Sequence, residues 1–217
     1  MNKFVFNEKE IIYQIKNSFS KAKSSGTSSI TLFLDRDGVI IKDVGYISNP
    51  KDVKLEGGIK VLLNKTRSLG IRVFVVTNQS GISRGYYDWI DFEKVNERMI
   101  DLLGHQSSIV AIYANSHINL EPRSWRKPNP YMLLNASERF NISMRNSMLI
   151  GDRLSDMIAG CTGGVNTLLH VRTGHGRDEF KKILEYCKDD FFIFKQNKSR
   201  IYFLKNLLEF PYEILNL

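Results

Sequence analysis

The chain has 217 residues, an apolar content of 42% and a net charge of +8. A chain of this length suits one α/β domain with modest additions, and because it contains no run of about 18 apolar residues, we expect no membrane-spanning helix. The positive charge suits an anionic ligand, but no run or stripe of Lys and Arg indicates a nucleic-acid surface.

The cysteines and the N-terminus indicate the cellular setting. Cys161 and Cys187 match neither the spacing of a metal site nor a disulfide framework. The first residues lack the apolar core and the small-residue cleavage site of a secretory signal. We therefore expect a cytoplasmic protein in a reducing compartment, and we expect it to be a monomer.

The first residues predict an extension before the main domain. Residues 4–23 have a loose helical periodicity, and the stretch SSGTSS at 24–29 has the composition of a flexible connector. We expect residues 1–29 to form a helical extension and linker, and residues 30–217 to form the main domain.

From residue 30 onward, short apolar runs alternate with amphipathic segments. Strands are expected at 30–34, 71–77, 108–114, 147–152 and 166–173, and helices at 57–70, 91–104, 128–140 and 155–161. After this core of residues 30–176, a helix, a strand and a second helix are expected within 177–217. The apolar runs lack period-two alternation, so they predict a mainly parallel sheet covered by helices on both faces.

Polar side chains follow the ends of the predicted strands, where parallel sheets bind their ligands. They are carboxylates, a hydroxyl, an amide and two cations: Asp35, Asp37, Thr77, Asn78, Arg126, Lys127, Asp152 and Asp156. Clustered carboxylates repel one another unless a cation neutralises them, and oxygen ligands without Cys or His favour magnesium. Magnesium beside Lys127 would suit a phosphoryl group. An Asp can attack such a group, and a second Asp can transfer the proton.

The segments DRDG, TNQSG, RKP and GDRLSD, in this order and at these strand ends, resemble the haloacid dehalogenase (HAD) superfamily of magnesium-dependent phosphatases. The resemblance implies an α/β fold, a Rossmannoid three-layer sandwich with a mainly parallel central sheet. Because no large insertion follows DRDG or the second strand, we expect no large cap domain.

Longer segments are similar to a narrower group within this superfamily. FLDRDGVIIKDVGYISNP, VVTNQSGISRG, RKPNPYM and VRTGHG, spread over about residues 30–176, resemble the phosphatases of D-glycero-D-manno-heptose 1,7-bisphosphate and of histidinol phosphate. This resemblance implies a small phosphorylated sugar as the substrate.

The resemblance also implies roles for individual residues. Asp35 would be the nucleophile and Asp37 the general acid and base, while Thr77 and Lys127 would bind the transferring phosphoryl group. Magnesium would be held by Asp35, by the backbone carbonyl of Asp37 and by Asp152. Substrate contacts are expected at Asp43, Gly45, Tyr46, Asn78, Gln79, Ser80, Arg126 and Arg153, and a supporting role, such as orienting Lys127, is expected for Asp156.

One departure from this group concerns a zinc loop. Many relatives carry a C-x-H and a C-x-C pair just before the RKP motif, where this chain reads YANSHINLEPRSWRKP. His117 is retained, but Asn115, Arg123 and Trp125 stand where cysteines are expected. Because a tetrahedral zinc site needs four good ligands, we expect no structural zinc.

The sequence thus favours a magnesium-dependent phosphatase that hydrolyses the 7-phosphate of heptose 1,7-bisphosphate through an aspartyl-phosphate intermediate. Neither a membrane nor a nucleic acid is expected as a partner. Three alternatives remain: a histidinol-phosphate phosphatase, a polynucleotide 3′-phosphatase, whose relatives share the TNQ-GI-RG pattern, and a non-catalytic binding protein that has kept the fold.

Overall fold

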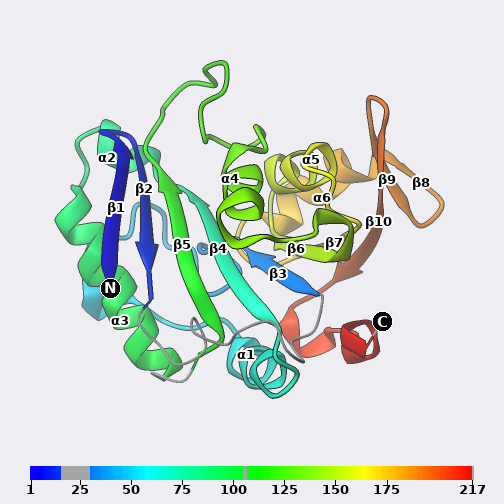
Figure 1. Cartoon of the computed structure of the whole chain (residues 1–217), viewed down its shortest axis with the longest axis horizontal. Helices are drawn as coiled ribbons and strands as arrows, with labels where there is room; N and C mark the ends of the chain where they lie inside the picture. The colour runs from blue at the N-terminus through cyan, green and yellow to red at the C-terminus, as the bar shows by residue number, and fades with distance from the viewer. Residues whose placement is uncertain (16–29, 105–106, 217) are drawn as a thin grey trace.

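In the computed structural model, which describes residues 1–15, 30–104 and 107–216, ten strands form one sheet in the order β1-β2-β5-β4-β3-β6-β7-β10-β9-β8 (Figure 1). The strands are β1 (Asn2–Asn7), β2 (Glu10–Gln14), β3 (Thr31–Leu34), β4 (Arg72–Asn78), β5 (Ile109–Asn115), β6 (Ser147–Gly151), β7 (Thr167–Val171), β8 (Cys187–Lys188), β9 (Phe191–Phe194) and β10 (Asn197–Leu204). The six central strands, which lie in the order β5-β4-β3-β6-β7-β10, pair in parallel. The β1–β2 and β8–β9 hairpins extend the two edges by antiparallel pairing. The mainly parallel α/β sheet predicted from the sequence is confirmed.

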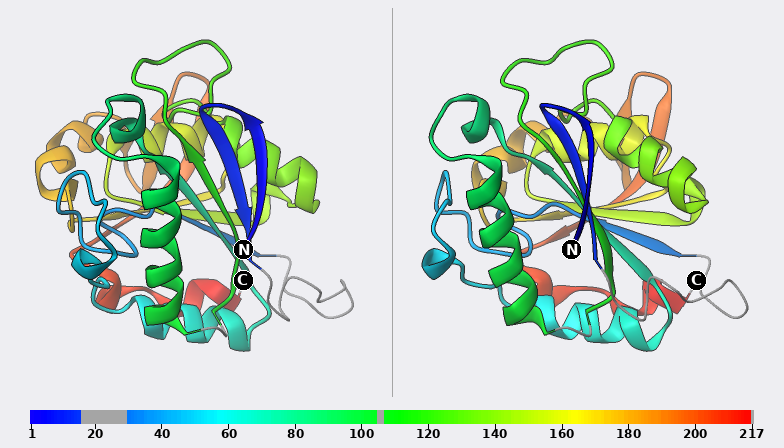
Figure 2. Two further views of the ribbon diagram at one scale, coloured as in Figure 1. Left: turned by 90° about the vertical axis from the view of Figure 1, so that its left-hand side faces the viewer. Right: turned by 60° about the vertical axis from the view of Figure 1, so that its left-hand side comes forward.

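Helices cover both faces of the sheet and complete a three-layer sandwich (Figures 1 and 2). They are α1 (Ile59–Ser68), α2 (Ser80–Ser83), α3 (Trp89–Leu103), α4 (Tyr131–Phe140), α5 (Leu154–Thr162) and α6 (Gly176–Leu184), with the 3-10 turns η2 (Pro50–Asp52), η3 (Met144–Asn146), η4 (Leu207–Glu209) and η5 (Tyr212–Asn216). Helices α1 and α3 and the last turns share one core with the sheet, and α4, α5 and α6 share the other.

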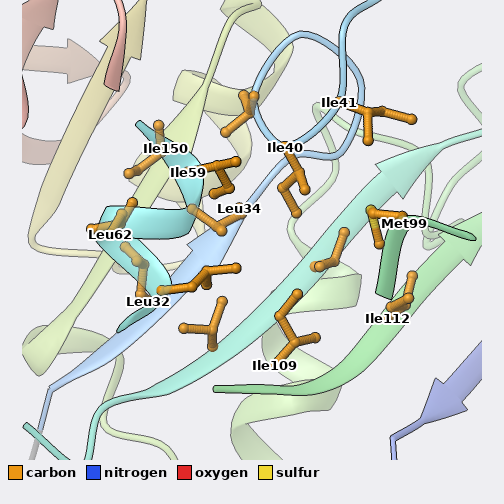
Figure 3. Packing of buried hydrophobic residues seen from close by; sticks show 14 of the residues in the cluster. Leu32, Leu34, Ile40, Ile41, Ile59, Leu62, Met99, Ile109, Ile112 and Ile150 are labelled. Atoms are coloured by element: carbon orange, nitrogen blue, oxygen red, sulfur yellow. The ribbon is translucent and has the colours of Figure 1, made fainter. Parts of the chain in front are cut away.

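The central strands send alternate side chains into these two cores. In β3, Leu32 and Leu34 belong to the core under α1 and α3, whereas Phe33 belongs to the opposite core. Figure 3 shows Leu32 and Leu34 packed against Ile59 and Leu62 of α1. Because β3 is fully buried on both faces, the residues that follow its end start from a fixed position.

The start of α3 follows from a capping box. The Asp88 side chain accepts hydrogen bonds from the backbone N–H groups of Ile90 and Asp91, and the Asp91 side chain accepts one from the Asp88 N–H. This reciprocal pair satisfies otherwise unpaired N–H groups at the helix start. The helix therefore begins at Trp89, before the residue predicted from the sequence.

The prediction of an N-terminal helix is wrong for the described part of the extension. Residues 2–14 form the β1–β2 hairpin, and β2 pairs with β5, so this segment belongs to the sheet. The physical reason lies in Ile11, Ile12 and Tyr13, which are consecutive and all buried. A surface helix could not bury three successive side chains, whereas a strand covered on both faces does. The connector at 24–29 lies outside the described residues.

The final helix predicted within 177–217 is also wrong. Residues 197–204 form β10, which pairs with β7 on one side and β9 on the other. Ser199 and Ile201 are buried while Lys198 and Arg200 are exposed, which is the period of a strand. In the described residues after β10, the elements are the short turns η4 and η5.

The described segments after β3 and β4 contain short turns and the helices α1, α2 and α3, with no inserted domain over the sheet edge. This agrees with the expectation of no large cap domain. Of the helices in the described part of the chain, none combines the length and the apolar character needed to cross a membrane.

Candidate active site

A pocket of about 650 Å³ lies at the edge of the sheet where the parallel strands end. Its walls include eleven of the residues singled out from the sequence: Asp35, Asp37, Asp43, Gly45, Tyr46, Asn78, Gln79, Ser80, Arg126, Lys127 and Arg153. The three remaining ones, Thr77, Asp152 and Asp156, are buried beside this wall. The sequence-predicted residues are therefore brought together, although their chemical roles stay predictions.

Asp35 is the first residue after β3. Its backbone N–H donates to the carbonyl of Ile150 over 2.9 Å, which continues the pairing of β3 with β6. Its side chain is 8% exposed, and its Oδ1 lies 2.8 Å from Lys127 Nζ. The carboxylate is thus fixed by a sheet hydrogen bond below and by a cation at its side.

Lys127 is held by buried oxygen atoms. Its Nζ donates to Asp35 and to the carbonyl of Val76, each over 2.8 Å, and forms an ion pair with Asp156 Oδ1 at 2.5 Å. Burial alone would lower the pKa of Lys127, but the adjacent Asp156 and Asp35 carboxylates raise it. The ammonium is therefore a permanent positive charge at the base of the pocket.

Asn78 fixes the backbone of Lys127. The Asn78 amide donates to the Lys127 carbonyl over 3.1 Å, and its oxygen accepts from the Lys127 N–H at 3.0 Å and from Asn115 Nδ2 at 2.7 Å. These contacts favour a positioning role for the Asn78 side chain over the substrate contact predicted for it.

Three buried carboxylates form a candidate metal centre. Oxygen atoms of Asp35, Asp152 and Asp156 all lie within 4.8 Å of one another, and this is the only group of potential metal ligands of its kind among the described residues. Burial, followed by the charges of Asp35 and Asp156, raises the pKa of Asp152 to about 9, and burial raises that of Asp35 to about 6. A cation would relieve this repulsion.

The chain also leaves one ligand oxygen of this cluster unpaired. Asp152 is 0% exposed, its Oδ2 accepts the His175 N–H over 2.7 Å, and its Oδ1 has no hydrogen-bond partner among the described residues. Gly38 has φ +81°, and a Cβ there would lie 2.6 Å from Asp152 Oδ2. The glycine therefore lets the backbone pass close to the carboxylate.

The carboxylate of Asp37 is held by the guanidinium of its neighbour Arg36. Arg36 Nη2 lies 3.1 Å from Asp37 Oδ1, and Arg36 Nε donates to Oδ2 over 3.2 Å. The guanidinium is 1% exposed and also contacts Gln79 Oε1 at 2.9 Å, Asn96 Oδ1 at 3.3 Å and the ring of Phe92. Sequence analysis assigned Arg36 no role, because nothing local predicts that α3 will cover it.

Gln79 completes this arrangement. Its amide donates to Asp37 Oδ2 and to Thr77 Oγ1, each over 2.8 Å, and its oxygen accepts from the hydroxyl of Tyr87 at 2.7 Å. Gln79 is 3% exposed. Its side chain is fully occupied by protein partners, which favours a role in orienting Asp37 over the predicted substrate contact.

The outer pocket is lined by cations. Arg84, Arg126 and Arg153 all face it, and burial together with the charges of Arg84 and Arg153 lowers the pKa of Arg126. Asp43 Oδ2 lies 3.1 Å from His175 Nε2 and 3.7 Å from Arg153 Nη2, so this carboxylate orients both side chains on the pocket wall.

Five residues that line the pocket had no role predicted from the sequence: Arg84, Tyr87, Pro128, Ser155 and His175. Arg84 lies in VVTNQSGISRG and His175 lies in VRTGHG, two segments that carry the family resemblance, but no role was predicted for either residue. Tyr46, which was predicted, stands at the rim, with its ring 4.5 Å from that of Tyr86.

Comparison with known proteins identifies the family. A family model described as HAD-hydrolase-like matches residues 124–192. The D-glycero-β-D-manno-heptose-1,7-bisphosphate 7-phosphatase of Helicobacter pylori J99 is 39% identical over 166 residues, which cover 73% of this chain and 95% of that protein. The D-glycero-α-D-manno-heptose-1,7-bisphosphate 7-phosphatase of Campylobacter jejuni is also 39% identical, over 76% of this chain and 95% of its own length.

Solved structures agree on the fold. A protein of Mesorhizobium loti assigned as a HAD-like phosphatase superposes with a TM-score of 0.75 and 27% identity, over 98% of this chain and 94% of its own. The D,D-heptose 1,7-bisphosphate phosphatase of B. bronchiseptica, solved with magnesium and phosphate, superposes with a TM-score of 0.69 and 21% identity, over 86% and 98%. The chain belongs to the heptose-1,7-bisphosphate 7-phosphatases, a family of phosphoric monoester hydrolases within the HAD superfamily.

Proposed function

We propose that this chain hydrolyses the 7-phosphate of D-glycero-D-manno-heptose 1,7-bisphosphate with magnesium as cofactor. One observation carries the proposal beyond the family. The pocket pairs Asp35 and Lys127 at its base with Arg84, Arg126 and Arg153 farther out. A single buried cation at the base and a separate group of three arginines suit a substrate with two phosphates.

The carboxylate cluster supports the choice of magnesium. Asp35 and Asp152 offer hard oxygen ligands, the unpaired Asp152 Oδ1 lacks a protein partner in the described chain, and the cluster contains no Cys or His. Together with the backbone carbonyl of Asp37, these residues would hold the ion. Bound magnesium would neutralise the carboxylates and polarise the phosphoryl oxygens.

Each step of the hydrolysis is assigned to a different residue of the site. Asp35 attacks the phosphorus atom, and the bond from phosphorus to the sugar oxygen breaks as Asp37 gives that oxygen a proton. Lys127 and the Thr77 hydroxyl stabilise the charge that develops on the phosphoryl oxygens. Asp37 then takes a proton from water, which attacks the aspartyl-phosphate and releases phosphate from Asp35.

The position of Asp37 supports its proton-transfer role. Arg36 and Gln79 engage its carboxylate from one side while the side chain keeps 18% exposure toward the pocket. A general acid must be oriented toward the leaving oxygen before the reaction, and these contacts provide that orientation without help from the substrate.

The substrate is tested with the purified chain, magnesium and a panel of phosphate monoesters. Heptose 1,7-bisphosphate in both anomeric forms should give a kcat/KM at least about tenfold above histidinol phosphate and a 3′-phosphorylated oligonucleotide, because neither of these presents a compact sugar with two phosphates. Preferred turnover of either comparator would contradict the proposed substrate and leave the phosphatase chemistry intact.

The nucleophile is tested by Asp35→Asn. We expect kcat to fall by at least about 10³-fold, because an amide is a poor nucleophile and cannot form the aspartyl-phosphate. The variant should still fold, because Asp156 remains beside Lys127 and the new amide oxygen can still accept from Lys127 Nζ. Retained turnover in a folded variant would exclude Asp35 as the attacking group.

The metal centre predicts a pH dependence of stability. Because the pKa of Asp152 is raised to about 9 in the folded chain, the metal-free protein binds more protons folded than unfolded. Its free energy of unfolding should therefore fall as pH rises from about 4 to 9. Magnesium at about 100 times its Kd should raise the melting temperature by about 5–10 °C near pH 8.

Asp152→Asn should flatten this pH dependence and abolish the magnesium effect, as measured by thermal melting. The exposed Asp178 provides the control, and Asp178→Asn should behave like the unaltered chain. A magnesium effect that survives in Asp152→Asn would place the ion elsewhere.

The contact between Arg36 and Asp37 is tested by comparing two substrates whose leaving groups differ in their need for a proton. In Arg36→Lys the bidentate contact to Asp37 is lost, so kcat/KM for a sugar phosphate should fall by about 10²-fold. For p-nitrophenyl phosphate, whose leaving group departs without a proton, the fall should be less than about fivefold. Equal losses on the two substrates would indicate general damage to the site and refute a specific role in orienting Asp37.

A further inference from the structure

The loop between β5 and α4 carries the pocket residues Arg126 and Lys127, and it lies beside the turn of the β1–β2 hairpin (Figures 1 and 2). The two elements are joined by backbone pairing, since the Ser116 N–H donates to the Lys9 carbonyl over 2.8 Å. This is the stretch in which relatives of this family are expected to hold zinc and this chain lacks the cysteines.

A single carboxylate from the hairpin closes this loop. Glu10 Oε1 accepts the backbone N–H of Trp125 over 2.8 Å and lies 2.9 Å from His117 Nε2. Because a carboxylate only accepts, His117 Nε2 must carry the proton and donate it. Glu10 thereby links residues near the two ends of the loop, and it is itself 7% exposed.

Other contacts hold Glu10 and the loop in place. Glu10 Oε2 accepts from Asn7 Nδ2 over 2.8 Å, which fixes the carboxylate within its own hairpin. The ring of Trp125 packs between Phe6 of β1, at a centroid distance of 4.8 Å, and Tyr113 of β5, at 5.4 Å. The contact is therefore buried, partly apolar and set by both strands of the hairpin.

The contact between Glu10 and His117 is connected to the outer pocket through Arg126. The backbone carbonyl of His117, whose ring Glu10 binds, accepts a hydrogen bond from Arg126 Nη1 over 2.8 Å. Lys127 is held independently by Asn78 and by the two carboxylates described above. The hairpin thus acts mainly on Arg126, and the base of the pocket has its own supports.

We propose that the β1–β2 hairpin is a metal-free clamp for the active-site loop, and that Glu10 is a positioning residue that aims Arg126 at the distal part of the substrate. The proposal rests on the phosphatase function proposed above. It assigns a role in substrate recognition to an N-terminal segment that sequence analysis treated as an extension.

The test is a double-mutant cycle of Glu10→Ala and Arg126→Ala with the preferred substrate of the wild-type chain. Glu10→Ala should raise KM by about tenfold and change kcat by less than about threefold. In the Arg126→Ala background the same change should raise KM by less than about twofold, because the side chain that it positions is already gone. The Ki of inorganic phosphate, which needs only the base of the pocket, should stay unchanged.

Two variants separate positioning from stability. Glu10→Gln keeps an oxygen that can accept the hydrogen bonds from Trp125 and His117. It should restore KM to within about threefold of wild type. Lys9→Ala removes the exposed 3.8 Å contact between Lys9 and Glu121, which joins the same hairpin and loop, and should leave KM unchanged. If Glu10→Ala does not fold, Glu10→Asp, which shortens the side chain, takes its place in the cycle.

The outcomes are distinct. KM effects that multiply in the double variant, or a loss of phosphate affinity in Glu10→Ala, would overturn the clamp while leaving the phosphatase function intact. A wild-type chain that hydrolyses no phosphate monoester would contradict the proposed function. In that case hydrogen exchange decides on the clamp: the amides of residues 116–127 should exchange faster in Glu10→Ala, and unchanged exchange would overturn it.

Discussion

The site depends on the charge balance around Lys127. A buried ammonium is tolerated only with close partners, and Asp35 and Asp156 supply them. Asp152 is equally buried, but among the residues that the structure describes its side chain receives a hydrogen bond only from the His175 backbone N–H. The cluster therefore holds more negative charge than the chain neutralises. This excess accounts both for the raised pKa of Asp152 and for the fit of a divalent cation, so metal binding and folding stability are two expressions of one electrostatic constraint.

The two partners of the central ion pair are positioned by different means. Asp35 continues a strand that is buried on both faces, so the sheet itself fixes it. Lys127 follows a long loop, which offers no such support, and its position is built from side-chain hydrogen bonds, above all those of Asn78 to its backbone. The side-chain amides near the site thus serve mainly to fix the position of a loop residue as firmly as a strand fixes its own residues.

This difference explains what could be predicted from the sequence. Asp35, Thr77 and Asp152 lie at the carboxyl ends of apolar strands, so the rule that ligands bind at this edge of a parallel sheet was enough to predict that they lie together. The hairpin was missed because β2 is held in the sheet by its pairing with β5. This pairing joins residues about 100 positions apart, such as Ile12 and Tyr113, and no local period in the sequence encodes such a contact. Arg36 was missed for a related reason, since a charged residue between two acids is normally exposed, and here residues distant in sequence, among them Phe92 and Asn96 of α3, bury it.

The hairpin shows what such a long-range contact can do for a loop. A zinc site fixes a loop through ligands that lie close together in the sequence, so it depends on metal supply and on reduced thiols. Glu10 joins the same kind of loop to a sheet edge through two hydrogen bonds to a carboxylate. Such bonds contribute roughly 1.5–3 kcal/mol each, but here they form only when β2 pairs with β5. The geometry of the distal pocket is therefore tied to the folding of the sheet edge.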